Sequence, residues 1–188
     1  MTVRALLATT NAHKARELRG MLGFPVDAQA VEVDETGETF AANALLKAHA
    51  AAGLAPAGTI ALGEDSGIAV VALGGEPGIR SARFAGPDDA ARRRALLERM
   101  SGVEDRRAAY VCALAAVLPD GRELVVEGRL EGELSQDERG DAGFGYDPIF
   151  VPEGEQRTVS ELGQARKDEI SHRARAARAL AAGLESGS

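Results

Sequence analysis

The chain has 188 residues and a formal net charge of −7, from 22 Lys and Arg against 29 Asp and Glu. This length predicts one large domain or two closely packed lobes. The acidic balance argues against binding of a nucleic-acid polymer, which normally requires a basic domain. A small anionic ligand is still compatible, because a few cations converging in one cleft outweigh a diffuse acidic surface.

Cysteine content and hydropathy predict a cytoplasmic protein without membrane attachment. The single cysteine, Cys112, excludes an intramolecular disulfide, and its apolar surroundings, YVCALAAVL, favour a buried hydrophobic role over a nucleophile. The apolar run near the N-terminus is too short for a signal peptide. No stretch approaches the ~20 apolar residues of a membrane span.

The first half of the chain alternates between runs typical of strands and runs typical of helices. Strands are expected where apolar residues are continuous or alternate with polar ones, and helices where they recur at helical spacing. In chain order we expect a strand at 3–10, a helix at 11–22, a strand at 26–33, a helix at 39–53, and strands at 59–65 and 67–75 on either side of Ser66-Gly67.

The second half predicts further helices around a β-hairpin. A charged helix runs from 87–89 to about Met100, and two long β segments at 107–134 are joined by the turn Pro119-Asp120-Gly121. Thr158 and Glu161 have capping-box spacing, and an Ala/Arg helix follows from about Ser171. The sequence therefore predicts an α/β fold with a mixed sheet, in a single domain over 1–188 without a separable linker.

The segment ATTNAHK, residues 8–14, joins the first strand to the first helix. Such a turn presents backbone N–H groups and the positive end of a helix dipole, which suit an anion. Asn11 and the Thr hydroxyls add neutral donors, and Lys14 adds a positive charge. The alternative is an ordinary loop in which Asn11 or a Thr caps the helix. The spacing of a Walker A loop is absent.

The segment GEDSG, residues 63–67, carries two acids between two strand-like runs. Acids flanked by glycines suit a divalent cation bound to phosphates. Glu64 and Asp65 point to opposite faces if the backbone is extended, so we expect them to have different roles. The alternative is a polar turn between strands, because Asp, Ser and Gly are common turn residues.

Two further polar segments have weaker patterns. The acids of VDETGETF precede a helix in which Asn43 and Lys47 lie one turn apart, and such acids also simply favour a helix N-terminus. In KDEISHR, residues 167–173, pattern alone does not rank the basic side chains, whereas Arg175 and Arg178 suggest a solvated helix face.

Together, these segments resemble the inosine triphosphate pyrophosphatase family in order and spacing, from about residue 4 to 180. The motifs are TTNAHK, DETGETFAANALLKA, EDSG, GGEPGIRSARFAG, GFGYDPIF and KDEISHR. Enzymes of this family hydrolyse non-canonical purine nucleoside triphosphates (ITP, dITP, XTP) to the monophosphate and pyrophosphate. The resemblance implies a long twisted mixed sheet with flanking helices, two lobes around a central active-site cleft, Mg²⁺ as cofactor, and a homodimer.

The resemblance also assigns roles to individual residues. Asp65 matches the general base and a metal-binding acid, with Glu64 and either Glu35 or Asp34 as the other metal acids, Glu35 being preferred. Substrate-binding residues, from the phosphate loop to the base-recognition set, are Thr9, Thr10, Asn11, Ala12, His13, Lys14, Lys47, Ser66, Phe144, Gly145, Tyr146, Asp147, Lys167, His172 and Arg173.

One residue departs from the family pattern in the phosphate loop. The family often has Gly where this chain has Thr10. Because a β-branched residue tolerates positive φ poorly, we expect the loop to follow ordinary backbone angles there.

The expected reaction is metal-assisted phosphoryl chemistry. Mg²⁺ on the carboxylates would bridge phosphate oxygens and offset developing charge. Asp65 would orient and deprotonate a water that attacks the α-phosphorus, and Lys14 and Lys47 would stabilise the leaving pyrophosphate.

The segment GFGYDPIF, residues 143–150, concentrates aromatic rings in a chain with only 4% aromatic residues. We expect its glycines to let the backbone approach a flat ligand, and Phe144 to stack on a purine, which is worth about 1–3 kcal/mol for any base. Selectivity then requires donors: Lys167 or Arg173 would pair with the C6 oxygen of hypoxanthine or xanthine and clash with the amino group of adenine.

Three other functions are compatible with parts of the pattern. A Maf-like pyrophosphatase acting on pyrimidine nucleotides is expected to lack GFGYDP and SHR. A phosphatase or kinase is disfavoured because the chain has no D-x-D or Walker signature. A non-catalytic nucleotide-binding module would have no use for the intact acids Glu64 and Asp65.

Overall fold

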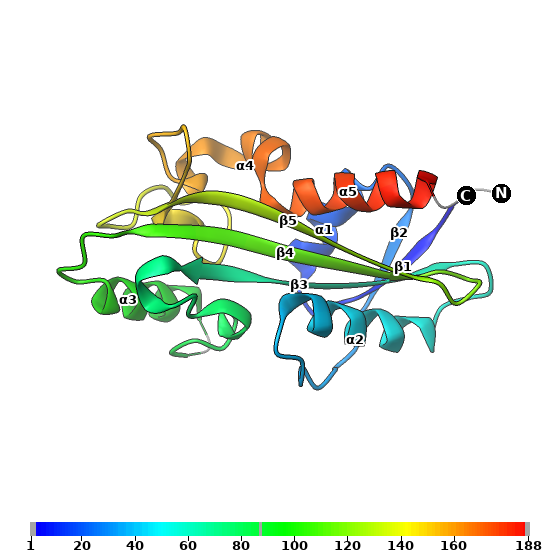
Figure 1. The fold of residues 1–188 in the computed structure, drawn as a ribbon. Coiled ribbons are helices and arrows are strands. Elements are labelled where there is room, and N and C mark those ends of the chain that lie inside the picture. Colours follow the sequence, from blue (N-terminus) through cyan, green and yellow to red (C-terminus); the bar gives the residue numbers. More distant parts are fainter. Residues whose placement is uncertain (1–2, 87, 187–188) are drawn as a thin grey trace. The chain divides into compact units, whose positions relative to one another are not determined.

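The structure is a computed structural model that describes residues 3–86 and 88–186. Its strands are β1 (Ala5–Ala8), β2 (Val26–Gln29), β3 (Ile60–Val70), β4 (Arg107–Val117), β5 (Glu123–Leu134) and β6 (Phe150–Pro152). Its α-helices are α1 (Ala12–Met21), α2 (Phe40–Ala52), α3 (Asp89–Arg99), α4 (Val159–Ile170) and α5 (His172–Ser186) (Figure 1). Short 3₁₀ helices lie at Val71–Leu73, Gly78–Arg80 and Asp147–Ile149.

The strands form one mixed sheet in the order β2-β1-β3-β4-β5-β6. β1 pairs in parallel with both β2 and β3, whereas β5 and β6 are antiparallel. β4 and β5 are neighbours joined by a tight turn in which the Gly121 N–H donates to the carbonyl of Leu118. The expected α/β fold with a mixed sheet and flanking helices is confirmed.

The structure corrects two predicted strand boundaries. The run expected at 59–65 and the first residues of the run expected at 67–75 form one continuous strand, β3, because Ser66-Gly67 is extended and does not turn the chain. The rest of the second run is not a strand, because β3 ends at Val70 and Val71–Leu73 form a 3₁₀ helix. A Cβ on Gly67 would lie 2.4 Å from the Gly78 carbonyl, so this glycine permits close backbone approach. β2 ends at Gln29, four residues earlier than expected, where its register with the short strand β1 also ends.

The chain forms two compact units, which are described separately. Unit 1 comprises Met1–Asp65, Cys112–Gly128 and His172–Ser188, and unit 2 comprises Ser66–Val111 and Arg129–Ser171. The long strands β3, β4 and β5 each contribute residues to both units.

Unit 1 is a sheet covered by helices on both faces. α1 and α5 pack on one face and α2 on the other (Figure 1). Successive side chains of β4 point to opposite faces of the sheet. Cys112 and Leu114 pack with α1 and α5, whereas Ala113 and Ala115 pack against α2. The predicted buried role of Cys112 is confirmed, because its side chain is fully buried.

Unit 2 encloses a separate core with more of the large and aromatic side chains. Leu96 of α3 and Met100, the residue that caps this helix, pack there with residues from the strand segments of this unit. Tyr110 and Phe150 form a tilted ring pair at 4.6 Å between centroids. The predicted capping box is present at the start of α4, with Thr158 and Glu161 each accepting from the other's backbone N–H.

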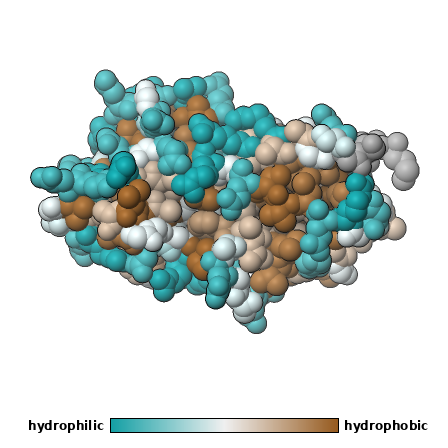
Figure 2. Space-filling view, in the orientation of Figure 1, coloured by the Kyte–Doolittle hydropathy of each residue, from teal (hydrophilic) through white to brown (hydrophobic). Residues whose placement is uncertain are grey.

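The surface is mostly polar, with apolar side chains concentrated over part of unit 1. Figure 2 shows brown atoms gathered between α5 and α2 on the face in view. Large hydrophobic residues of this unit that are exposed include Leu46 on α2 and Val125 on β5. In the described part of the chain, no helix combines the length and the hydropathy that crossing a membrane requires.

Candidate active site

Unit 1 brings Asp65 together with two residues of α2 and one acid of the preceding loop. The Asp65 carboxylate accepts hydrogen bonds from Asn43 Nδ2 at 3.3 Å and Lys47 Nζ at 3.0 Å. Lys47 Nζ also lies 2.6 Å from Glu35 Oε1, so one ammonium joins two carboxylates. Asn43 and Lys47 share a helix face because they are four residues apart.

Glu64 points to the opposite face of β3, as its alternation with Asp65 predicts. Its carboxylate lies 2.6 Å from Lys14 Nζ and accepts from Arg173 Nη2 at 3.0 Å and Cys112 Sγ at 3.4 Å. Arg173 also pairs with Glu17 of α1. Two acids thus hold two cations in a buried network of four charges. The alternative of a polar turn at GEDSG is excluded, because both acids lie within β3.

The electrostatics of the Asp65 cluster favour a proton acceptor. Burial raises the pKa of Asp65 above its ordinary value, and the nearby Lys47 and Lys14 only partly offset this effect. Burial lowers the pKa of Lys47, but Asp65 and Glu35 outweigh it, so the net pKa of Lys47 is raised. Lys47 therefore stays charged beside a carboxylate whose proton affinity is increased.

The protonation states of Arg173 and Cys112 around Glu64 are fixed by their electrostatic surroundings. Burial lowers the pKa of Arg173, but Glu64 and Glu17 outweigh it, so the pKa is raised and the guanidinium stays charged. Burial, followed by the charge of Glu64, raises the pKa of the Cys112 thiol well above its usual value. Cys112 is thus a protonated donor to Glu64, and a nucleophilic role is disfavoured.

The loop from Thr9 to Lys14 uses part of its donor set internally. Asn11 caps α1, its Oδ1 accepting from the backbone N–H groups of His13 at 2.9 Å and Lys14 at 3.2 Å. The Asn11 N–H donates in turn to Thr9 Oγ1 at 3.1 Å. The capping interpretation is therefore correct for Asn11 Oδ1, whereas the Asn11 amide nitrogen and the Lys14 ammonium are groups suited to a phosphate.

The rest of this loop is open to solvent. Thr10, Ala12 and His13 are exposed, and His13 Nδ1 lies 3.0 Å from Arg16 Nη2. Among the described residues other than glycine, only Ala85 has positive φ, so Thr10 follows ordinary backbone angles as expected.

The two candidate metal acids of the DETG segment differ in placement. Glu35 is half-buried and directed at Lys47, whereas the side chain of Asp34 is exposed and its carbonyl accepts from the Thr36 N–H. No group of three or more His, Cys, Asp or Glu side chains within residues 3–86 and 88–186 has the arrangement of a metal site.

In unit 2, Asp147 organises the aromatic loop. Its carboxylate accepts from the Phe144 N–H at 3.0 Å, from Tyr110 Oη at 3.1 Å and from Lys167 Nζ at 2.7 Å. Lys167 Nζ also lies 4.2 Å from the centroid of the Phe144 ring, within cation–π range. The structure therefore brings together three of the residues predicted to bind the nucleoside, Phe144, Asp147 and Lys167.

The two glycines around Phe144 have different structural reasons. Gly143 has φ +83°, and a Cβ there would lie 2.3 Å from Asp147 Oδ2, so this glycine makes room for the carboxylate. Gly145 has φ +62° with open space where a Cβ would be. Glycine at 143 thus serves the internal packing of the loop, which differs from the expected approach to a flat ligand.

Two further predicted substrate-binding residues are Tyr146, within the aromatic loop, and Ser66, next to Asp65 in the chain. Tyr146 is buried and its hydroxyl donates to the Ser81 carbonyl at 2.9 Å, while burial raises its pKa to about 12. Ser66 is half-buried on β3, directly after Asp65.

The SHR motif spans the end of α4 and the start of α5: Ser171 caps α4, and its N–H donates to the Lys167 carbonyl at 2.9 Å. His172 and Arg173 begin α5 in unit 1 and are buried there, whereas Lys167 belongs to unit 2. Arg173 Nε, Nη1 and Nη2 all donate to carboxylates of Glu64 or Glu17. This placement gives no support to the expected contact between Arg173 and a base.

Sequence reasoning missed several residues that hold these sites together. Glu17 is one, a charge among the apolar positions of α1, and its buried ion pair with Arg173 spans most of the chain length. The others are Tyr110, Ser81, Asp89 and Arg93 in unit 2. An unexplained acid on an apolar helix face was the only available signal, because partners far apart in sequence leave no local pattern.

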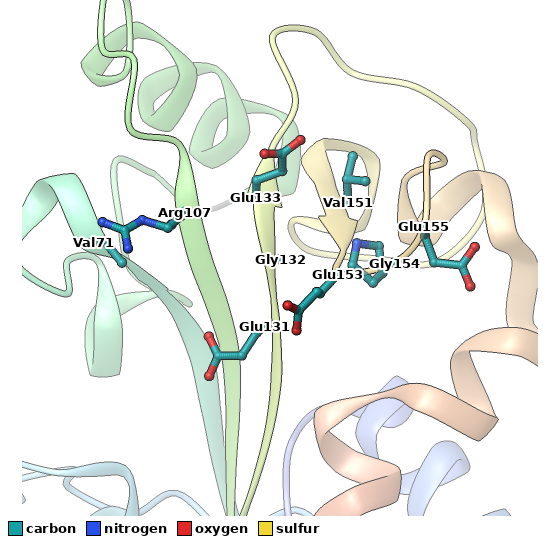
Figure 3. Close-up of a pocket in the computed structure, with 10 residues that line it drawn as sticks. Val71, Arg107, Glu131, Gly132, Glu133, Val151, Glu153, Gly154 and Glu155 are labelled. Carbon is teal, nitrogen blue, oxygen red and sulfur yellow. The ribbon is translucent and has the colours of Figure 1, made fainter.

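Two hollows in the surface lie away from the predicted residues. One, of about 450 Å³ in unit 2, is lined by Glu131, Glu133, Glu153 and Glu155 with Arg107 (Figure 3). Such a lining repels a triphosphate. The other, of about 740 Å³ in unit 1, is lined mainly by apolar residues such as Leu22, Phe24 and Leu118.

Acid–lysine pairs around β3, and a lysine of α4 that lies over the ring of an aromatic loop, are side-chain arrangements that suit an α/β enzyme acting on nucleotides. The chain belongs to the Ham1 family, whose model matches residues 5–183.

Relatives and solved structures agree with this assignment. A dITP/XTP pyrophosphatase of Symbiobacterium thermophilum is 53% identical, covering 92% of this chain and 90% of its own, and one of Streptomyces coelicolor is 49% identical, covering 94% of each. The Ham1 protein of Staphylococcus aureus has a TM-score of 0.86 at 35% identity, covering 98% of this chain and 100% of its own. A dITP/XTP pyrophosphatase of Mycobacterium abscessus has a TM-score of 0.74 at 44% identity, covering 95% and 98%.

Proposed function

We propose that this protein hydrolyses non-canonical purine nucleoside triphosphates, namely ITP, dITP and XTP, to the monophosphate and pyrophosphate. The reaction would remove these nucleotides from the nucleotide pool. Close relatives over nearly the whole chain are named dITP/XTP pyrophosphatases, which supports the substrate class. A cytoplasmic location follows as part of the proposal, because the pool is there and the only cysteine is a buried thiol.

The observation that carries the chemical step is the Asp65 cluster. Its carboxylate has a raised pKa, sits 3.0 Å from the Lys47 ammonium and is held by Asn43. A base needs an increased proton affinity and a fixed orientation, and this environment supplies both. Asp65 thus orients and deprotonates the water that attacks the α-phosphorus, while Lys47 and Lys14 offset the negative charge of the leaving pyrophosphate.

The acids of unit 1 fit a magnesium ion bound together with substrate. Mg²⁺ is usually held by one or two carboxylates, with phosphate and water oxygens as its other ligands. Asp65 and Glu35, which share Lys47, provide such a pair. We assign these two as the metal acids, and when bound the ion would neutralise phosphate charge. Glu64 holds Lys14 on the other face instead.

Arg173 and Glu17 have a positioning role in this proposal. Lys14 is directed by Glu64, and Glu64 is held from behind by Arg173, which Glu17 balances. The network orients a phosphate-binding lysine, so its loss would weaken triphosphate binding. Breaking a buried pair on one side typically costs about 3–5 kcal/mol, so stability would fall as well.

Unit 2 supplies the base site. Phe144 offers a ring for stacking, and its neighbour Lys167 has three N–H donors, of which one goes to Asp147. A donor on Lys167 suits the C6 oxygen of hypoxanthine and faces the amino group of adenine unfavourably. Lys167→Ala should therefore lower the ITP/ATP ratio of kcat/KM, whereas Phe144→Ala should lower both values together.

Pyrophosphate release from a nucleotide panel tests the function. Purified protein with Mg²⁺ is given ITP, dITP, XTP, ATP, GTP and UTP, with Asp65→Asn as the inactive control. We expect kcat/KM for ITP, dITP and XTP to exceed that for ATP by at least about 10²-fold. Preference for UTP would favour the Maf-like alternative, and ITP binding without product would favour a non-catalytic module.

A homodimer is the proposed assembly. Exposed apolar residues on α2 and β5 of unit 1 support a protein contact there. Sedimentation equilibrium measures the mass directly: about twice the 19.6 kDa of the chain is expected, and a single-chain mass across the concentration range would contradict it.

A further inference from the structure

Helix α3 holds both backbone polar groups of one residue in the aromatic loop. The Gly145 N–H donates to Asp89 Oδ2 at 2.7 Å, and the Gly145 carbonyl accepts from Arg93 Nη1 at 2.9 Å. Asp89 and Arg93 are one turn apart on α3, so a single face of the helix forms hydrogen bonds with the two peptide groups on either side of Gly145.

These contacts fix the backbone that carries Phe144. The Phe144 N–H is already held by Asp147, and the next N–H along the chain is the one held by Asp89. Gly145 itself has φ +62°, a conformation glycine adopts without strain but does not enforce. The α3 contacts therefore restrict a residue that would otherwise leave the direction of the Phe144 ring weakly defined.

Other contacts hold the side chains of Asp89 and Arg93 in place. Arg92 donates to Asp89 Oδ1 at 2.8 Å and also to the Ala82 carbonyl, and Arg93 Nε lies 3.0 Å from Glu138 Oε2. Further along α3, Leu96 is fully buried in the core of unit 2. The side chain of Arg93 is only 14% exposed, so its bond to Gly145 is largely shielded from water.

A purely structural surface role explains these contacts less well. Exposed salt bridges contribute little, about 0–1 kcal/mol, and helix acids such as Asp89 often just favour the N-terminus. Here, however, Asp89 in the first turn of α3 accepts a hydrogen bond from the Gly145 N–H of the loop, and Asp88 caps the helix instead. Arg93 likewise donates to a backbone carbonyl 52 residues away in sequence, beside the proposed stacking ring.

We propose that Arg93, together with Asp89, is a positioning residue that presents the Phe144 ring to the base of the substrate. The inference rests on the proposed function, because it takes Phe144 as the stacking residue. Neither side chain touches the base in this proposal. Both act through the peptide groups of Gly145, so their loss should weaken nucleoside binding and leave phosphate binding unchanged.

The test compares two ligand fragments in matched variants. Arg93→Met removes the donors and keeps the aliphatic stem. Arg93→Lys keeps a positively charged donor group, and Arg94→Met changes the exposed neighbour on α3 as control. Affinities for IMP and for inorganic tripolyphosphate are measured by titration calorimetry, with kcat and KM for ITP. In Arg93→Met we expect IMP affinity to fall, and KM to rise, by about fivefold or more, with kcat within about twofold.

The fragments separate positioning from general damage. Tripolyphosphate affinity should stay within about twofold in every variant, Arg93→Lys should recover part of the IMP loss, and Arg94→Met should match the parent. Equal losses of IMP and tripolyphosphate affinity in Arg93→Met would overturn the proposal, because a loosened fold does not choose between fragments. Unchanged IMP affinity would overturn it as well.

A double-mutant cycle with Phe144→Ala decides whether Arg93 acts through the ring. If it does, Arg93→Met has no further effect on IMP affinity once the ring is gone, and fully additive losses would contradict the proposal. Should Phe144→Ala alone leave IMP affinity unchanged, the stacking role in the proposed function is wrong, and this inference falls with it. If Phe144→Ala lowers IMP affinity and Arg93→Met does not, the inference about Arg93 is wrong and the proposed function is unaffected.

Discussion

At the scale of single residues, neighbouring acids on β3 receive opposite environments. Asp65 meets Lys47 and Asn43 on one face, and Glu64 meets Lys14 and Arg173 on the other. Strand alternation points the two side chains to opposite sides of the sheet, and the helices on each side supply different partners. One acid can therefore serve proton transfer while the other fixes a cation.

The first prediction concerns Asp65 as the base. Asp65→Asn should lower kcat for ITP by at least about 10²-fold, a typical general-base contribution, because an amide cannot take the proton of the water. IMP affinity, measured by calorimetry, should persist, since Asn keeps an oxygen for Lys47. Turnover within about threefold of the parent would show that Asp65 is not the base.

The second prediction separates the two acids of the DETG segment. Glu35→Gln should raise the Mg²⁺ concentration for half-maximal activity by about tenfold, a typical loss for a changed metal environment. Asp34→Asn is the matched control, because its side chain is exposed and Glu35 is the acid directed at Lys47. The measurement is activity against Mg²⁺ at saturating ITP. A larger shift in Asp34→Asn would reverse the assignment.

At the scale of elements, the contact between β3 and α2 sets the geometry around Asp65. Gly63 of β3 faces α2 so closely that a Cβ would lie 2.0 Å from the Ala44 carbonyl and 2.4 Å from the Ala48 nitrogen. Small residues on both elements therefore bring Lys47 within reach of Asp65. The Ala-rich composition of α2 serves this close approach as well as helix propensity.

The third prediction follows from this contact. Gly63→Ala should destabilise unit 1 by about 1–3 kcal/mol or more, because the added methyl group overlaps helix backbone that cannot move aside alone. Gly20→Ala on α1 is the control, since open space surrounds that position and Ala favours a helix by about 1 kcal/mol. Urea unfolding measures both. Equal stability of Gly63→Ala and the parent would mean that α2 shifts freely.

At the scale of the whole molecule, stability at high pH depends on a buried phenol. The pKa of Tyr146 is raised by burial to about 12. As pH rises, the Tyr146 phenol of the unfolded chain therefore loses its proton first, near pH 10. The ionisation of this group leaves the free energy of unfolding unchanged below about pH 10 and lowers it as pH rises from 10 toward 12.

The fourth prediction tests that linkage. The free energy of unfolding, measured in urea at several pH values from 9 to 11.5, should fall more steeply with pH in the parent than in Tyr146→Phe. The variant should also be less stable at pH 9 by about 0.5–1.5 kcal/mol, because it loses the hydrogen bond to the Ser81 carbonyl. Identical slopes would show that Tyr146 does not carry the effect.

Local sequence determined much of this protein. The periodicities at 11–22 and 39–53, the hairpin turn and the capping box at Thr158 all predict elements that the structure contains, because these signals depend on residues within one or two turns. Motif order supplied the family, and alternation alone placed Glu64 and Asp65 on opposite faces of their strand.

Tertiary structure decided which partners each charged group meets. Nothing near Arg173 in sequence indicates that Glu17 and Glu64 neutralise it, or that Arg93 holds Gly145. Ser66-Gly67 has the composition of a turn and yet continues β3, because Gly67 lets the chain around Gly78 approach the strand. Burial and long-range pairing set these outcomes, since the energy of a charge depends on its surroundings in space and not on its neighbours in sequence.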